Sequence, residues 1–151
     1  MYTLSYAIEV NPEGILPVLT ADQVWKGLEM KAVDALPFVP GMTRCEVIER
    51  AGNTLLREIS IPGGDFVERI TFHAPVQVQF ERVGSNGFIQ NTISDSERGL
   101  LLTFTFGLSF AGTEPGSVEE RKAGENMRGS YIAAVKATLD RVRELAGKGE
   151  I

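Results

Sequence analysis

The sequence predicts an α+β fold in which a seven-stranded antiparallel sheet curls around one long C-terminal helix. Three observations support this prediction: an alternating strand near the N-terminus, six further strand-like segments between Met42 and Phe110, and a long helical segment after Ser117. The final helix is the only large element able to cover the apolar face of such a sheet, so the two are expected to pack together. A length of 151 residues predicts a single domain, residues 1–151.

The composition excludes several classes of protein. Apolar residues make up 43% of the chain, and no segment approaches the roughly 20 apolar residues that cross a bilayer. With one cysteine, Cys45, no intrachain disulfide can form and no thiolate metal site is expected. No metal and no cofactor are predicted. A net charge of -5 with interleaved signs argues against nucleic acid as a partner. The N-terminal segment lacks the pattern of a signal peptide, so we predict a cytoplasmic protein.

The first predicted strand covers residues 2–10. Its apolar residues alternate with small or polar ones, which is typical of a strand with one buried and one wet face. The apolar set is Tyr2, Leu4, Tyr6, Ile8 and Val10. Asn11, Pro12 and Gly14 end the strand.

The first helix is predicted to begin after Thr20. Thr20 followed by Gln23 is a capping-box pattern, and Leu19 can pack against Val24 across the helix start. The segment 37–41, PFVPG, ends the helical region, which leaves space for one or two short helices after the first strand.

Six strands are predicted between Met42 and Phe110. Gly-rich or Asn-containing turn signals at 51–53, 62–65, 84–87 and 95–99 separate them. The last helix is predicted over 118–146, because Ser117 and Glu120 form a second capping-box pattern and Gly147 is placed as a stop.

The order of these elements over essentially the whole chain resembles the START-like (SRPBCC) helix-grip superfamily of birch-pollen-allergen-like ligand carriers and polyketide cyclases. The segments DQVWKGLEMKA, FVPG, LLREI, VERITFHAPVQVQF and NMRGSYI together are similar to its bacterial AtaL-like subfamily. The resemblance implies the helix-grip fold and an internal site for a hydrophobic ligand. It supplies no catalytic residues to carry over.

Matching the apolar faces of neighbouring strands predicts the sheet register. The expected cross-strand pairs are Ile61 with Phe66, Ile59 with Glu68, Arg57 with Ile70, Val83 with Phe88, Phe80 with Asn91, and Ile93 with Leu100. A one-residue bulge at Pro75 is expected to keep both flanking strands in phase and to place Glu68 opposite Arg82. In this register His73 points to solvent, so the lone histidine is not expected to be a catalytic residue.

The register also places polar side chains on the inward face. Arg57, Glu68, Arg82 and Asn91 are expected there, and buried charges are costly unless they are paired. One interpretation is a compensated cluster that orients the polar end of a ligand. The other is an ordinary ion pair at the rim, contributing about 0 to 1 kcal/mol.

The predicted ligand-binding residues are Trp25, Arg57, Glu68, Ile70, Phe72, Phe80, Arg82, Asn91, Phe104, Phe106, Met127 and Tyr131. Glu68, Arg57 and Tyr131 are also the candidate catalytic groups. Trp25, Met30 and Phe38 either gate the wide end or simply close it by packing. Cys45 is expected to be a packing residue.

Three functions are compatible with this sequence. The first is binding of a small hydrophobic or aromatic molecule between sheet and long helix. The second is a polyketide cyclase or aromatase using the same cavity, and the third is a protein-interaction module using the outer face of the sheet. Aromatic side chains could instead fill the cavity. Whether the protein is an enzyme, and whether it forms a homodimer, stay open.

Overall fold

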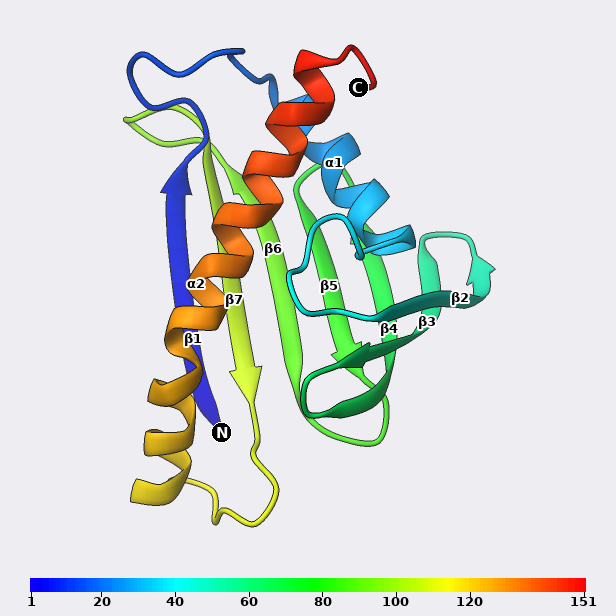
Figure 1. Ribbon diagram of the computed structural model, residues 1–151, viewed down its shortest axis with the longest axis vertical. Coiled ribbons are helices and arrows are strands. Elements are labelled where there is room, and N and C mark those ends of the chain that lie inside the picture. Colours follow the sequence, from blue (N-terminus) through cyan, green and yellow to red (C-terminus); the bar gives the residue numbers. More distant parts are fainter.

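The computed structural model describes residues 1–151 and contains seven strands and two helices (Figure 1). In chain order these are β1 (Tyr2–Glu9), α1 (Ala21–Val33), β2 (Arg44–Ala51), β3 (Thr54–Ile61), β4 (Gly64–His73), β5 (Gln77–Arg82), β6 (Phe88–Ser94), β7 (Leu101–Leu108) and α2 (Val118–Gly147). All neighbouring strands are antiparallel in the order β1-β7-β6-β5-β4-β3-β2. The predicted fold class is confirmed. Neither helix combines the length and the apolar character needed to span a membrane.

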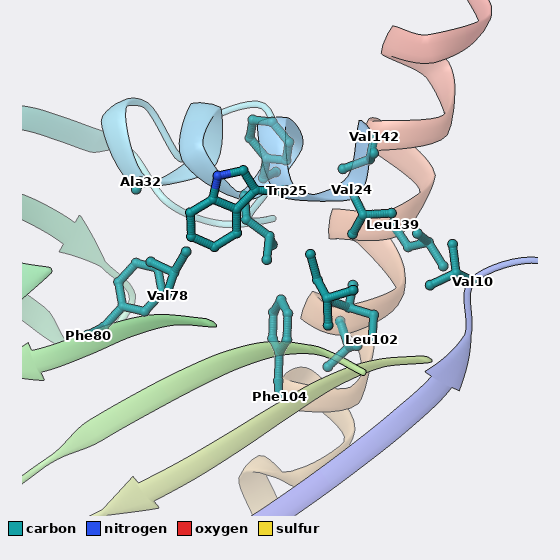
Figure 2. Close-up of a cluster of buried hydrophobic side chains, with 14 of the residues drawn as sticks. Val10, Val24, Trp25, Ala32, Val78, Phe80, Leu102, Phe104, Leu139 and Val142 are labelled. Carbon is teal, nitrogen blue, oxygen red and sulfur yellow. The ribbon is translucent and has the colours of Figure 1, made fainter. Parts of the chain in front are cut away.

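The two helices cover different parts of one sheet face. α2 lies over β1 and β7, whereas α1 packs against β5, β6 and the second half of α2 (Figure 1). Val24 and Trp25 of α1 point toward Leu102 and Phe104 of β7, and α2 closes the side of this core (Figure 2). Because α2 covers mainly the β1–β7 side, the centre of the sheet is left to α1 and to the loop that follows it.

The predicted start of α1 is confirmed. The Thr20 side chain accepts the Gln23 backbone N–H, and the Gln23 side chain accepts the Thr20 backbone N–H. No second helix follows, so the alternative with two short helices is wrong. The backbone N–H groups of Phe38 and Val39 both donate to the Ala35 carbonyl in a single turn. Pro37 and Pro40, which have no N–H, prevent its continuation.

The start of α2 is as predicted, but its cap differs in one bond. Ser117 accepts the Glu120 backbone N–H at 3.1 Å. The Glu120 carboxylate accepts the N–H of Gly116, not that of Ser117, so the reciprocal bond of the capping box is not formed. The helix ends at Gly147, one residue beyond the predicted end.

The predicted β3–β4 register is wrong by two residues. Ile59, not Ile61, lies opposite Phe66, because the hairpin turn consists of Pro62 and Gly63 alone. Gly63 has a φ of 129°, a backbone conformation that residues with a side chain rarely adopt. The shift preserves the inward face, since side chains alternate with a period of two. Its consequence is that Arg57 lies directly opposite Glu68.

The other two predicted hairpin registers are also wrong by two residues, β5–β6 in the same direction and β6–β7 in the opposite one. Phe80 lies opposite Ile89 rather than Asn91, because the Val83 N–H donates to the Val67 carbonyl and Val83 does not join the pairing with β6. Ile93 lies opposite Leu102, and the carbonyl of Leu100 accepts the N–H of Val10 instead.

The β4–β5 pairing is as predicted, with Glu68 opposite Arg82. Phe72 lies opposite Val78, so both strands keep their apolar residues on the same face. Pro75 lies in the three-residue connection between His73 and Gln77 and not at a bulge within a strand. The connection itself reverses the chain, so no extra residue is needed to keep the strands in phase.

Gly124 and Gly129 on α2 should respond oppositely to alanine substitution. A Cβ at Gly124 would lie 2.2 Å from the Tyr2 ring, whereas a Cβ at Gly129 would have no neighbour within 4 Å. We expect Gly124→Ala to destabilise the protein by about 1–2 kcal/mol through this overlap. Gly129→Ala should stabilise it by up to about 1 kcal/mol through helix propensity alone. Urea unfolding of the two variants measures both effects. Equal changes in the free energy of unfolding would contradict the close approach of α2 to β1.

Candidate functional site

A half-open hollow lies between the centre of the sheet, α2 and the loop after α1. Its volume is about 110 Å³. The apolar part of its wall consists of Val39, Met42, Ile59, Ile61, Phe80, Ile89, Phe104, Phe106 and Ala134. The polar lining residues are Lys31, Arg57, Glu68, Arg82 and Tyr131. The hollow is therefore an apolar space into which a few charged groups project, as is usual for ligand sites.

The structure brings part of the predicted set together at this hollow. Arg57, Glu68, Phe80, Arg82, Phe104, Phe106 and Tyr131 all line it. Ile70 and Phe72 lie on the same face of the sheet but contribute to the packed core instead. Asn91 is completely buried and reaches the site only through its contact with Lys31.

Two of the predicted ligand-binding residues, Trp25 on α1 and Met127 on α2, do not line the hollow. The Trp25 ring packs edge-on against Phe72 at 6.3 Å within the core, and Phe38 is also buried there. The buried positions of Trp25 and Phe38 agree with the interpretation that these residues close the wide end by packing. Met127 is exposed on α2, in the half of the helix that lies over the start of β1. Met30 is exposed on α1.

Lys31 is the site residue that the sequence analysis missed. It is only 6% exposed, although lysine is almost never buried without a partner. Its position carried a signal, because Lys31 follows Leu28 by three residues and Val24 by seven, which places it on the apolar stripe of α1. A charge at such a position indicates either a partner inside the protein or a shifted pKa.

The Lys31 amine projects from α1 onto the middle of the sheet. Its Nζ donates to Asn91 Oδ1 at 2.9 Å and lies 4.8 Å from the ring centroids of both Phe80 and Phe104. Burial, and to a smaller extent the positive charge of Arg57, lower the pKa of Lys31 to about 7, while Glu68 and Cys45 oppose the shift. Near neutral pH a large fraction of this amine is therefore uncharged.

Arg57 joins the end of α1 to the sheet. Its Nη1 donates to the backbone carbonyls of Lys31 and Ala32, each at 2.9 Å, and so satisfies the C-terminal end of the helix. Its Nη2 lies 3.6 Å from Glu68 Oε2. Arg57 is 2% exposed and Glu68 is 3% exposed, so this ion pair is buried and not at the rim.

Arg82 and Tyr131 lie nearer the mouth of the hollow. The Arg82 guanidinium stacks over the Phe66 ring at 3.9 Å. The Tyr131 ring lies 4.5 Å from that of Phe106, and burial raises the pKa of its hydroxyl while the Arg82 charge opposes that change. The hollow is thus lined by the basic side chains Lys31, Arg57 and Arg82 and by the single carboxylate of Glu68.

The remaining candidates, His73 and Cys45, do not line the hollow. His73 is exposed at the end of β4, as predicted. Cys45 is half-buried, and its sulfur accepts the Ala35 N–H at 3.4 Å and a contact from Arg57 at 3.6 Å. No three His, Cys, Asp or Glu side chains lie together in a way that could hold a metal ion. On the outer face of the sheet, polar pairs such as Ser5 with Thr105 and Gln77 with Thr92 are hydrogen-bonded.

Solved structures with a similar fold include the ZhuI aromatase/cyclase from Streptomyces sp. R1128, at 16% identity and a TM-score of 0.69 over 96% of this chain and 95% of that one. The di-domain aromatase/cyclase StfQ of the steffimycin pathway matches at 12% identity and TM-score 0.69, over 98% of this chain and 51% of StfQ. Ara h 8.0201 matches at 10% identity and TM-score 0.60, over 93% of this chain and 97% of Ara h 8.0201.

A search of curated protein sequences found no significant match. At these identities the structural likeness shows the helix-grip fold, which the resemblance had implied. The family model described as AtaL, acetylaranotin biosynthesis cluster protein L, matches residues 4–149. The chain therefore belongs to the AtaL family.

Proposed function

We propose that this protein binds a small aromatic or otherwise hydrophobic molecule in the hollow between sheet and α2. The observation that carries the proposal is an apolar wall into which three basic side chains, Lys31, Arg57 and Arg82, project beside a single carboxylate. An apolar ring fits the wall of Phe80, Phe104 and Phe106. A carboxylate, enolate, phenolate or carbonyl oxygen on that ring is directed toward Lys31 and Arg57.

The expected affinity follows from the size of these contacts. A single aromatic ring that buries about 150 Å² of apolar surface gains roughly 4 kcal/mol. One hydrogen bond to a charged donor adds about 1.5–3 kcal/mol. After part of this gain is lost to immobilising the ligand, dissociation constants between about 100 μM and 10 mM are expected for one-ring ligands. Larger ligands that extend out of the half-open mouth should bind more tightly.

A cyclase-like enzyme using the same hollow is the second candidate. The observation in its favour is that Lys31, Glu68 and Tyr131 supply three titratable groups to one apolar space. Such groups can polarise a carbonyl and move protons in a folded poly-ketone. The aromatase/cyclases among the similar structures make this chemistry a natural one to test. A binding protein releases its ligand unchanged, whereas an enzyme of this kind releases a cyclised product.

Blocking the hollow should remove ligand binding. Ala134 lines it from α2, and neighbouring Ala133 is exposed on the same helix. We expect wild-type protein and Ala133→Phe to bind anilinonaphthalene sulfonate, an anionic aromatic probe, saturably. Ala134→Phe should weaken that binding at least about tenfold, because the new ring fills the hollow. Fluorescence titration measures all three proteins. Equal binding by the two variants, or no saturable binding by the wild type, would contradict the proposal.

A further inference from the structure

We infer that Lys31 is a nucleophile that captures an aldehyde or ketone ligand as a covalent imine inside this hollow. The inference deepens the proposed function and rests on it, because the carbonyl compound must first occupy the same space. The ligand is then an aromatic or hydrophobic carbonyl compound, and the hollow has a chemical activity beyond reversible binding.

The surroundings of Lys31 Nζ suit an uncharged amine. A charged ammonium has three N–H donors, yet Asn91 Oδ1 is the one acceptor that the Lys31 side chain contacts. The Glu68 carboxylate, which could neutralise it, is paired with Arg57 instead. The ring centroids of Phe80 and Phe104 lie 4.8 Å from Nζ, a cation–π distance that favours the charged form but supplies no hydrogen-bond acceptor. A neutral amine needs fewer partners and keeps a lone pair for attack.

The net effect of burial and of the charged groups around Lys31 also favours the uncharged amine. Arg57, on β3, disfavours a second positive charge, whereas Glu68 on β4 and Cys45 on β2 favour it more weakly than burial and Arg57 oppose it. The resulting pKa of about 7 leaves roughly half of the amine uncharged at pH 7. An exposed lysine with a pKa near 10.4 has only about one molecule in 2,500 uncharged at that pH. Desolvation beside another cation is a general way to activate a lysine nucleophile.

The same site can polarise the carbonyl that Lys31 attacks. Arg57 lines the hollow, and its buried Nε–H has no hydrogen-bond acceptor. An unsatisfied buried donor of this kind costs free energy, and a ligand oxygen would recover it once the Arg57 side chain shifts to expose Nε to the hollow. A carbonyl oxygen accepting from Arg57 would direct its carbon toward the amine between Phe80 and Phe104.

The covalent step is a condensation without oxidation or reduction. The Nζ lone pair forms a bond to the carbonyl carbon, and the π electrons move to oxygen, which takes up a proton. The carbinolamine then breaks its C–O bond, releases water and loses the proton on nitrogen as the C=N bond forms. One carbonyl compound and one amine give one imine and one water. The half-open mouth allows this water to leave and protons to exchange with solvent.

Reductive trapping at pH 7 tests the inference. Full-length protein is incubated with benzaldehyde and sodium cyanoborohydride, which converts an imine into a stable benzylamine. Peptide mass mapping then measures labelling at each lysine. We expect Lys31 to be labelled at least about tenfold faster than Lys26, which is exposed on the same helix. Equal or slower labelling of Lys31 would overturn the inference.

Two variants and one matched ligand complete the experiment. Lys31→Arg keeps the positive charge but cannot form the imine, so the rapid labelling should disappear, whereas Lys26→Arg should retain it. If Lys31→Arg does not fold, the wild-type peptide map decides alone. Benzyl alcohol, which matches benzaldehyde in shape but has no carbonyl, reports binding by ligand-observed NMR. Binding of benzyl alcohol without labelling of Lys31 overturns the imine but leaves the proposed function. If benzyl alcohol does not bind and Lys31 is not labelled, both the imine and the proposed function are overturned.

Discussion

Between pH 7 and pH 10, the free energy of unfolding of the wild-type protein should rise by about 3 kcal/mol relative to that of Lys31→Met. In the folded protein the pKa of Lys31 is about 7, mainly because of burial and then because of Arg57. In the unfolded chain it returns to the ordinary value of 10.5. Between these two values the unfolded chain binds more protons than the folded one, so raising the pH stabilises the fold.

The direction of this dependence is specific. The stabilising contribution of neutral Lys31 is fully present above about pH 10.5 and is lost as the pH falls toward 7, where the buried amine must take up a proton. Urea unfolding at several pH values measures the slope for wild type and variant. Lys26→Met, a substitution at an exposed lysine on the same helix, should keep the wild-type slope. Parallel curves for wild type and Lys31→Met would show that Lys31 titrates normally.

Replacing Arg57 by methionine should destabilise the protein by about 3–5 kcal/mol. The substitution removes two hydrogen bonds to the Lys31 and Ala32 carbonyls at the end of α1. It also leaves the buried Glu68 carboxylate without its cation. Arg44→Met is a matched control on the neighbouring strand, because Arg44 pairs with Glu46 and Glu58 but is substantially exposed. An exposed pair of this kind contributes only about 0 to 1 kcal/mol.

Denaturant unfolding of both variants separates the buried pair from the exposed one. A double-mutant cycle with Glu68→Gln then isolates the part of the Arg57 effect that acts through the carboxylate. Loss of Arg57 should also raise the pKa of Lys31, since Arg57 is the main charge that lowers it. The pH dependence of stability should therefore become shallower in Arg57→Met. An Arg57→Met variant no less stable than Arg44→Met would contradict the structural role of the buried cluster.

Local signals accounted for most of the fold. The helix starts at Thr20 and Ser117 follow from short-range hydrogen bonds between a cap and the next turn, and in both helices the cap side chain accepts the expected backbone N–H. The alternating strands correctly assigned the inward face, including Arg57, Glu68 and Arg82. Their inward position depends only on the parity of each residue along its strand.

The register errors have one physical origin. Two registers that differ by two residues place the same side chains on the same face, so the apolar pattern alone does not distinguish them. The choice depends on the length of each turn and on bonds from outside the pair, such as the Val83 N–H to the Val67 carbonyl. The tight turn at Pro62 and Gly63 moved Glu68 from its expected place opposite Ile59 to a place opposite Arg57.

The sequence by itself determined the order of the elements, the helix-grip class and the inward face of each strand, because these depend on local caps and on side-chain periodicity. Only the tertiary structure decided which inward polar groups meet. Arg57 and Glu68 face each other because of one short turn, and Lys31 reaches the sheet because α1 rests over β5 and β6. The candidate site is thus a product of turn length and helix placement, and neither is encoded within a single element.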